Sequence, residues 1–117
     1  MLKASLADLL RRLPGPRTPK WPDGERFVEA FVHGSLAVEL YAPVGSDPQT
    51  PHDRDEVYFV LSGSGDFVLA GSSSRFVGGD ALFVAAGAEH RFENFTPDFA
   101  AWVVFYGPKG GESPAAA

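Results

Sequence analysis

Two histidines and one glutamate are the residues of this chain whose types and spacing best fit metal chemistry. His52 and Glu56 are four residues apart in the stretch QTPHDRDEVYFVLSG (residues 49–63), and His90 lies in a second stretch, GDALFVAAGAEHRFEN (residues 79–94). If the first stretch is extended, the alternation of side chains along a strand places His52 and Glu56 on the same face. Two imidazoles and one carboxylate suit Fe(II), Mn, Ni or Zn and leave coordination positions open for water or substrate.

Each of these residues also has a plainer structural interpretation. His52 is followed by charged residues in a polar segment, where a histidine is usually exposed. Glu56 opens an apolar strand, where a buried carboxylate is costly, so a metal, Arg54 or Arg91 must neutralise it unless it stays in water. His90 could be a histidine at the edge of the core that is bonded to the backbone. The residue types alone leave both interpretations open.

The two stretches resemble the two sequence motifs of the cupin superfamily. The first motif reads H-x-H-x-x-x-E-x-x-x-x-x-x-G, and its four fixed positions are occupied here by Thr50, His52, Glu56 and Gly63. The second motif reads G-x-x-x-x-x-P-x-G-x-x-H-x-x-x-N, and its positions are occupied by Gly79, Ala85, Gly87, His90 and Asn94. The resemblance covers residues 35–106 and implies an all-β double-stranded β-helix, or jelly-roll cupin barrel, with a divalent metal in its mouth.

The chain departs from the first motif at its first histidine, which is replaced by Thr50. A site of three histidines and one glutamate is therefore not available, and the resemblance implies His52, Glu56 and His90 as the metal ligands. Thr50 could hold a metal-bound water, and Gln49 could lend an amide oxygen, although neither is a strong ligand for a transition metal.

A second group of residues is predicted to line a pocket beside the metal. Tyr58 shares the face of Glu56 by the same count along the strand, and it is the one side chain beyond the ligands that could act as an acid or base. Core packing is the alternative for most of the aromatic members of this group, which consists of Gln49, Thr50, Tyr58, Phe83, Phe92 and Trp102. Asn94 is expected to tie a turn through its side-chain amide. Residues 53–55 are expected to form a solvated rim.

The elements expected to position these residues are short strands. Glycine- and proline-rich turns recur at roughly 8–12-residue intervals, which is typical of a sandwich or barrel. Strands are expected at residues 25–33, 35–42, 56–61, 67–70, 75–77, 81–85, 90–95 and 99–106, with a hairpin turn at 34–35 and further turns at 63–66 and 71–74. Within 35–42, apolar residues at even positions alternate with more polar residues, which predicts one buried face and one wetter face.

The chain is expected to form one domain in three parts. Residues 1–24 would supply a short helix and a Pro-rich connector packed on the barrel, residues 25–107 the barrel itself, and residues 108–117 a mobile tail with nothing to bury. The helix is expected at residues 5–13, where its leucines form one stripe that covers the core or, as the alternative, a dimer contact.

The sequence also predicts how the helix begins and how the connector is held. Ser5 can cap the helix, and Asp8 three residues later makes a weaker version of a capping box. The connector is expected to be anchored to the barrel by Trp21.

Composition excludes several classes of protein. The 117 residues carry a formal net charge of −5 and no basic stripe, which argues against nucleic-acid binding. The chain contains no cysteine, so disulfides and thiolate zinc sites are excluded. No apolar run approaches the ~18 residues of a membrane span, and charged residues interrupt the N-terminus where a signal peptide would be apolar. A cytoplasmic location is therefore expected, and the resemblance implies a homodimer.

The resemblance implies a small metal-dependent enzyme that acts on a small polar or aromatic molecule. Cupins include dioxygenases, isomerases and lyases, and the fold does not choose among these activities. Two alternatives remain at this point: a non-catalytic barrel that binds a small ligand as a sensor or store, and a structural barrel with an empty site. The threonine in place of the first motif histidine favours these alternatives.

Overall fold

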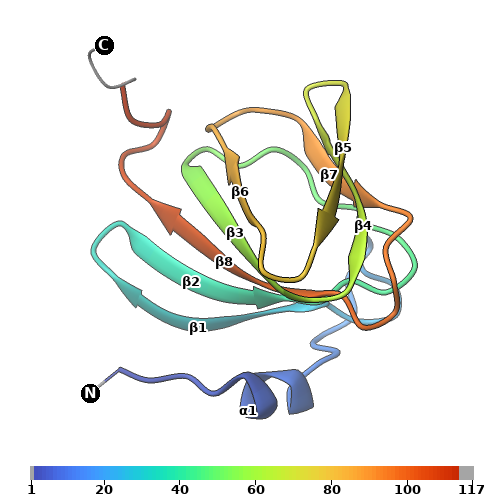
Figure 1. The fold of residues 1–117 in the computed structure, drawn as a ribbon. Helices are drawn as coiled ribbons and strands as arrows, with labels where there is room; N and C mark the ends of the chain where they lie inside the picture. Colours follow the sequence, from blue (N-terminus) through green and yellow to red (C-terminus); the bar gives the residue numbers. More distant parts are fainter. Residues whose placement is uncertain (1, 114–117) are drawn as a thin grey trace.

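The structure, a computed structural model, describes residues 2–113 and contains in that range one helix and eight strands (Figure 1). The helix is α1 (Leu6–Arg11), and the strands are β1 (Phe27–His33), β2 (Leu36–Tyr41), β3 (Asp55–Ser62), β4 (Ser64–Leu69), β5 (Ser72–Val77), β6 (Ala81–Val84), β7 (His90–Glu93) and β8 (Ala100–Tyr106).

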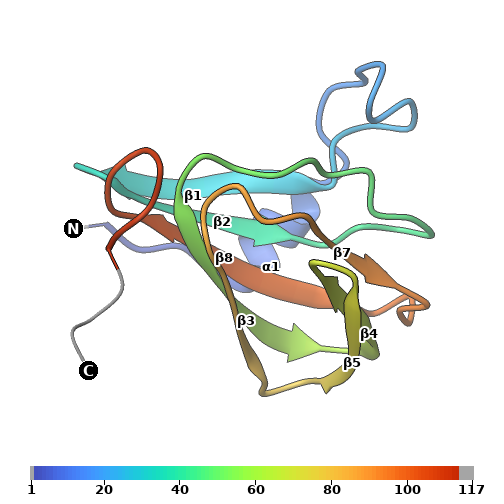
Figure 2. The ribbon, with the colours of Figure 1, turned by 90° about the horizontal axis from the view of Figure 1, so that it is seen from above.

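The strands form two antiparallel sheets that face each other. One sheet has the order β1-β2-β8-β3-β6, and the smaller one has the order β5-β4-β7. Figures 1 and 2 show the two sheets curving toward each other to enclose the interior, with α1 outside the larger sheet. The all-β barrel with a short N-terminal helix that the sequence predicts is confirmed.

An aromatic cluster fills the interior between the sheets. Phe92 on β7 is 1% exposed and packs against Phe99 and Phe67 at ring-centroid distances of 4.6 and 5.0 Å. Burying a side chain of this size stabilises the fold by about 1.5–3 kcal/mol. Because alternate residues of a strand share a face, Phe92 also fixes His90, two residues earlier, with its side chain inside the barrel.

The two faces of strand β2 have different surroundings: its apolar face packs against α1 outside the barrel, and its more polar face lines the interior. The alternating sequence did not predict this assignment. Leu40 is fully buried on the outer face of the larger sheet, where α1 packs and where Leu9 is 4% exposed. The more polar set, which includes Glu39 and Tyr41, points into the barrel and lines a cavity. The wetter face is therefore the interior one, because the mouth of this barrel is hollow.

The helix is shorter than predicted and lacks the predicted side-chain cap. Ser5 occupies the N-cap position, but its side chain makes no capping hydrogen bond. Asp8 pairs with Arg11 instead of closing a capping box. No helix in the range 2–113 has the length and apolar character that a membrane span requires.

The turns are tighter than predicted and the strands beside them longer. Gly63 alone joins β3 to β4, with φ +83°, and a Cβ there would lie 2.7 Å from the Cα of Phe99. Residues 72–74 are not a turn but the start of β5, paired with β4. A polar serine run is tolerated there because β5 is an edge strand whose backbone is paired on one side only.

The first half of the predicted tail is held against the barrel. The amide of Gly110 donates to the carbonyl of Asp53 (2.6 Å), and the amide of Glu112 donates to Oδ2 of Asp55 (2.8 Å). Asp55 is 4% exposed, so the prediction that it belongs to a solvated rim is wrong. The rest of the predicted mobile tail, residues 114–117, lies outside the described residues.

Candidate metal centre

His52, Glu56 and His90 converge on one point inside the barrel, and their ligand atoms all lie within 4.8 Å of one another. Oε1 of Glu56 is 2.7 Å from Nε2 of His90 and 3.4 Å from Nδ1 of His52. The side chains of Glu56 and His90 are fully buried, whereas that of His52 is 38% exposed. The group is thus closed on one side and reachable on the other.

His52 reaches this point from a loop and not from a strand. It lies three residues before β3, so the alternation argument that placed it on the same face as Glu56 does not apply. Instead, the amide of Gly87 donates to the carbonyl of His52 (2.7 Å), and the imidazole packs on Phe105 with 4.9 Å between ring centroids. Gly87 has φ +79°, a conformation that favours glycine. The second motif therefore positions the histidine of the first.

His90 is oriented by a backbone carbonyl. Its Nδ1 lies 2.9 Å from the carbonyl oxygen of Ala88, so Nδ1 carries a proton and donates it there. Nε2 is then left to face Glu56. Burial alone would lower the pKa of His90, but Glu56 and the Ala88 carbonyl outweigh burial, and the net shift of the pKa is upward. A ring held in this way presents one nitrogen to a metal, as ligating histidines usually do.

Glu56 is a buried carboxylate without hydrogen-bond partners. Nε2 of His90 lies 2.7 Å from Oε1, but the proton of this ring is on Nδ1, so neither Oε1 nor Oε2 accepts a hydrogen bond among the described residues. Nδ1 of His52 is buried and equally without a partner. Burial alone would raise the pKa of Glu56, but His52 and His90 outweigh burial, and the net shift of the pKa is downward. Since a buried carboxylate without a partner is costly, these orphaned atoms fit a bound divalent cation.

A hydrogen-bond network continues behind His90. The hydroxyl of Tyr58 lies 3.1 Å from Nε2 of His90 and donates to Oε1 of Gln49 at 2.9 Å. Nε2 of Gln49 donates to Oδ2 of Asp47 (2.7 Å), which also accepts from the backbone amide of Phe92 (2.8 Å). Burial, then the charges of Glu56 and Asp47, raise the pKa of Tyr58. The phenol therefore keeps its proton and is held in place beside the candidate metal ligands.

Asp47 and Tyr41 are members of this site that sequence reasoning missed. Asp47 accepts a hydrogen bond from the Tyr41 hydroxyl as well as those of the network. Asp47 lies in a proline-rich loop and belongs to neither motif, so no local spacing could have identified it. Its partner Phe92 is 45 residues away in the sequence.

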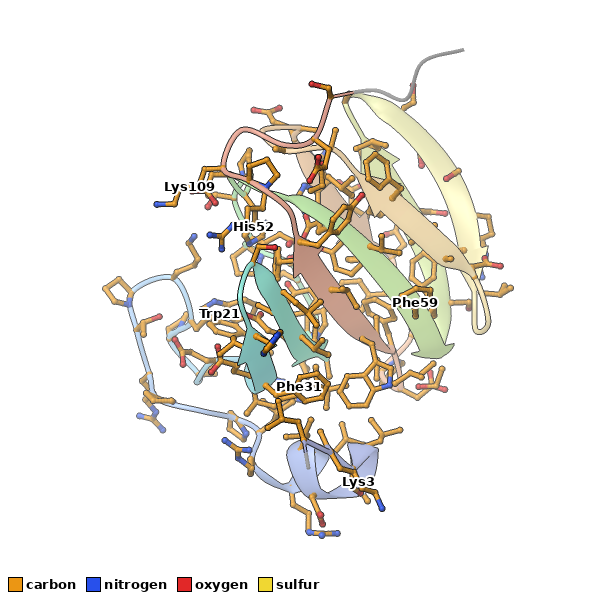
Figure 3. All side chains as sticks on the ribbon, turned by 90° about the vertical axis from the view of Figure 1, so that its left-hand side faces the viewer. Lys3, Trp21, Phe31, His52, Phe59 and Lys109 are labelled. Carbon is orange, nitrogen blue, oxygen red and sulfur yellow. The ribbon has the colours of Figure 1, made fainter. Side chains whose placement is uncertain are left out.

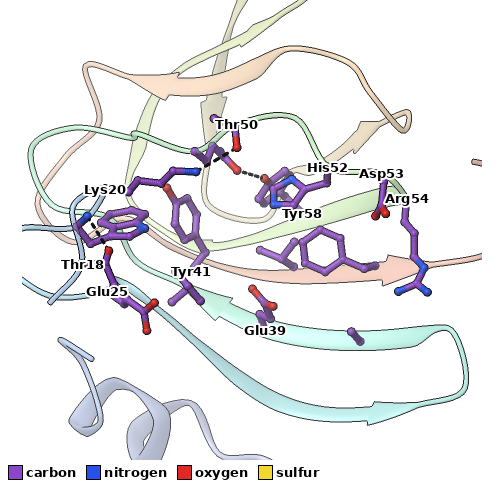
Figure 4. Close-up of a pocket in the computed structure, with 16 residues that line it drawn as sticks. Thr18, Lys20, Glu25, Glu39, Tyr41, Thr50, His52, Asp53, Arg54 and Tyr58 are labelled. Atoms are coloured by element: carbon purple, nitrogen blue, oxygen red, sulfur yellow. Dashed lines mark hydrogen bonds between the residues drawn. The ribbon is translucent and has the colours of Figure 1, made fainter. Parts of the chain in front are cut away.

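A cavity of about 470 Å³ opens beside this group, between the larger sheet and the N-terminal connector (Figure 4). His52 and Tyr58 form part of its wall, and Gln49 and Thr50 also line it. Thr50 is exposed and accepts a hydrogen bond from Nζ of Lys20 (3.1 Å), so it faces the mouth of the cavity. Figure 3 shows the connector residue Trp21 and His52 on the same side of the molecule.

The structure places three predicted pocket residues elsewhere. Phe92 is in the core and does not line the cavity. Phe83 on β6 is 53% exposed. Trp102 on β8 lies opposite Phe59 of β3, and both line a separate groove on the outer face of the larger sheet. Asn94 has φ +50° and donates from Nδ2 to Asp66 of β4 (3.0 Å), so its side-chain amide bonds to a neighbouring strand and not within its own turn.

The sequence of this barrel matches a known protein family and a curated relative. The family model described as "Cupin domain" matches residues 37–106, which contain both sequence motifs. The uncharacterized protein SCO3923 of Streptomyces coelicolor is 36% identical over 85 residues, which cover 71% of this chain and 81% of that protein.

Two further similar proteins are a lyase, matched in both sequence and structure, and a cupin barrel of known structure. The dimethylsulfoniopropionate lyase DddQ of Ruegeria pomeroyi is 34% identical over 80 residues, covering 66% of this chain but 40% of the lyase. The crystal structure of that lyase matches with a TM-score of 0.55 and 28% identity, over 71% of this chain and 48% of the other. A cupin 2 conserved barrel domain protein from Salinispora arenicola matches with a TM-score of 0.59 and 20% identity, over 69% and 74% of the two chains.

Proposed function

The chain belongs to the cupin domain family, and from this premise we propose that it is a metal-dependent enzyme of lyase type that acts on a small carboxylate in the cavity. One observation carries the proposal. Glu56 is fully buried between His52 and His90, with both carboxylate oxygens free of hydrogen bonds, beside a cavity large enough for a small ligand.

The metal would be held by His52, Glu56 and His90, as a facial set of two imidazoles and one carboxylate. Fe, Mn, Ni and Zn all accept this donor set. A divalent cation bound to these residues would polarise a substrate oxygen and, by its positive charge, lower the pKa of Tyr58.

The chain's own residues supply the remaining steps of an elimination. Tyr58 lines the cavity and lies beside His90. Once its lowered pKa has let the phenol release its proton to water in the cavity, the phenolate oxygen can take a proton from the carbon next to the substrate carboxylate. The electrons of that C–H bond form a carbon–carbon double bond, and the leaving group departs from the next carbon with its bonding pair. Gln49, bonded to the Tyr58 hydroxyl, holds the phenol in place. The aromatic wall that includes Phe105 excludes water from the reacting carbon.

The similarity to the lyase DddQ favours this reaction type over the dioxygenase and isomerase alternatives. The match spans 40% of the length of DddQ, so we propose the lyase activity for this chain on the shared barrel and not on the whole enzyme. Dimethylsulfoniopropionate is the first substrate to assay, followed by a panel of small phenols, keto acids and sugars.

Metal analysis of the purified chain tests the metal half of the proposal. We expect about one transition metal per chain, removed by chelators and lost in His52→Ala and His90→Ala. A metal-free protein whose melting temperature is the same with and without added metal would overturn the metal assignment. Full metal affinity in His90→Ala would show that the three ligands are wrongly assigned.

The Tyr58→Phe variant tests the catalytic half. It removes only the hydroxyl, so we expect metal content to be retained while the turnover number for an identified substrate falls by at least about 100-fold. Unchanged turnover in this variant would exclude Tyr58 as the proton acceptor.

A non-catalytic ligand-binding barrel is the second candidate. Thr50, which replaces the first motif histidine, bonds to Lys20 and is exposed, so it adds no strong ligand to the metal set. This candidate predicts that a small molecule raises the melting temperature without being converted, whatever metal is supplied.

A further inference from the structure

One wall of the cavity is acidic and aromatic, and it is distinct from the group of His52, Glu56 and His90. Glu39 and Tyr41 project from β2 into the cavity, as Figure 4 shows. Phe27 of β1 pairs with Tyr41 and lines the cavity beside it. Trp21 and Glu25, which precede β1, close the same wall. We call these five residues the acidic wall.

The aromatic members of the acidic wall form a corner. The indole of Trp21 lies 6.1 Å from the rings of both Phe27 and Tyr41, at interplanar angles of 62° and 80°. These rings pack edge to face on one another and all three line the cavity, where a ring face that is turned to the cavity attracts an organic cation.

The carboxylates of the acidic wall have no cationic partner. No ion pair within residues 2–113 involves Glu25 or Glu39. Glu39 also lies directly opposite Glu29 of β1, and like charges at facing positions of a sheet repel. Burial raises the pKa of Glu39, and the carboxylates of Glu29, Glu56 and Glu25 raise it further against the opposing effect of His52.

The basic residues of the cavity do not neutralise this wall. Lys20 donates to Thr50 across the mouth, and Figure 4 shows Arg54 beside Asp53, at the opposite end of the cavity from Glu25. Neither Lys20 nor Arg54 forms an ion pair with Glu25 or Glu39, so both carboxylates of the wall remain available to a cation in the cavity.

We infer that the acidic wall binds the cationic group of the substrate, a small organic onium such as a quaternary ammonium or a sulfonium. An onium group has no N–H to donate, so it is held by carboxylate charge and ring faces, which are what this wall offers. Trp21, Glu25 and Phe27 precede the residues matched by the family model, so the N-terminal connector and β1 supply three of the five residues of the wall, and β2 supplies Glu39 and Tyr41. The inference deepens the proposed function and rests on it, since it takes the cavity as the substrate site.

Binding of choline and of its neutral isostere 3,3-dimethylbutan-1-ol tests this inference. The two molecules have the same shape and differ in the positive charge. Calorimetric titration of the full chain, with and without bound metal, should show choline binding at least about tenfold more tightly, which corresponds to ~1.4 kcal/mol. Equal affinity for the two molecules, or no choline binding at millimolar concentration, would overturn the inference.

The Glu39→Gln variant locates the binding. It removes the charge and keeps the size of the side chain, so we expect about a tenfold loss of choline affinity and no change in affinity for the neutral isostere. Asp98→Asn, which removes an exposed charge in the loop between β7 and β8, is the matched control and should bind choline as the unaltered chain does. Unchanged choline affinity in Glu39→Gln would overturn the assignment to this wall.

The outcomes separate this inference from the proposed function. Metal analysis of Glu39→Gln should give the same metal content as the unaltered chain, since Glu39 is not one of the three proposed ligands. Charge-selective choline binding in a chain that holds no metal would support the acidic wall and overturn the metal-dependent enzyme. A chain that holds metal but does not prefer choline to its isostere would support the metal-dependent enzyme and overturn the acidic wall as a cation site.

Discussion

Asp55 and Glu56 are adjacent carboxylates at the start of β3, both buried, and their surroundings are opposite. Asp55 points away from the cavity and accepts backbone hydrogen bonds from Ala86 (2.9 Å) and Glu112 (2.8 Å). Glu56 points into the barrel, and neither of its oxygens has a hydrogen-bond partner. The carboxylate of Asp55 accepts hydrogen bonds that join parts of the fold, whereas the carboxylate of Glu56 accepts none.

This difference in hydrogen bonding indicates that Asp55 has a structural role and that Glu56 is a candidate functional residue. Asp55 joins three segments: β3, the loop that carries Ala86 and Gly87, and the residues after β8. Because Gly87 holds His52, the bonds of Asp55 also support the position of a proposed metal ligand. Glu56 joins no segments through hydrogen bonds, and its charge is balanced only by what lies beside it, namely His52 and His90 or a cation that these residues would hold.

Replacing Glu56 by Gln should have the largest effect on metal binding. The amide keeps the shape of the side chain but removes the negative charge, so we expect metal affinity to fall by more than the ~100-fold typical of lost outer-shell partners. In the presence of a chelator the variant should melt somewhat lower than the unaltered chain but lose less than Asp55→Ala, since only the attraction of Glu56 to His52 and His90, which lowers its pKa, is removed. Isothermal titration with metal and thermal melts measure the two effects.

The melting temperature of Glu56→Gln also tests whether Glu56 differs from Asp55 in its contribution to the fold. If Glu56→Gln without metal melts as low as Asp55→Ala, then Glu56 stabilises the fold through His52 and His90 as strongly as Asp55 does through its hydrogen bonds. The two carboxylates would then not differ in their contribution to the fold.

Replacing Asp55 by Ala should have the largest effect on stability. It removes the acceptor of two partly buried hydrogen bonds, from the amides of Ala86 and Glu112, so we expect the melting temperature to fall by roughly 5–10 °C. Metal affinity should change by less than in Glu56→Gln, because no proposed ligand is removed. Asp53→Ala, at an exposed neighbour that takes part in the fold through its backbone carbonyl, is the control and should melt within about 2 °C of the unaltered chain.

The stabilising effect of Asp55 should disappear in acid. Hydrogen bonds from the amides of Glu112 and Ala86 lower the pKa of Asp55 below its ordinary value. A group whose pKa is lower in the folded state stabilises it above the unfolded pKa of about 3.9, and the effect is lost as the pH falls through the folded pKa. The difference in melting temperature between the unaltered chain and Asp55→Asn should be full at pH 6–7 and shrink below about pH 4. A difference that stays constant to pH 2 would contradict this origin.

The sequence predicted the parts of the site that are encoded by local spacing. His52, Glu56 and His90 could be identified because two motifs fix their distances from Gly63 and Gly87, and those glycines sit at turns that the fold requires. The convergence was predicted for a partly wrong reason, since His52 lies in a loop held by the second motif and not on β3.

The rest of the site depends on contacts between distant segments. Asp47 is one of many acidic residues in loops until β7 places the amide of Phe92 beside it. Asp55 looks like a rim residue in the sequence because the amides that bury it come from positions 86 and 112. Trp102 could not be assigned to a face by alternation alone. Which face of β8 is interior depends on its register with β3, where Trp102 pairs with Phe59.

Removing residues 108–117 should have a smaller effect than removing the carboxylate of Asp55. The truncation takes away the amide of Glu112 and the Gly110 bond to Asp53 but leaves the bond from Ala86, so Asp55 keeps one of its two partners. We expect the melting temperature to fall by a few degrees, about half the effect of Asp55→Ala, with metal content unchanged. Removing only residues 114–117 is the control and should change neither. A truncated chain that melts like the unaltered one would show that the bond from Ala86 is sufficient to hold Asp55, and that the residues after β8 do not support the site.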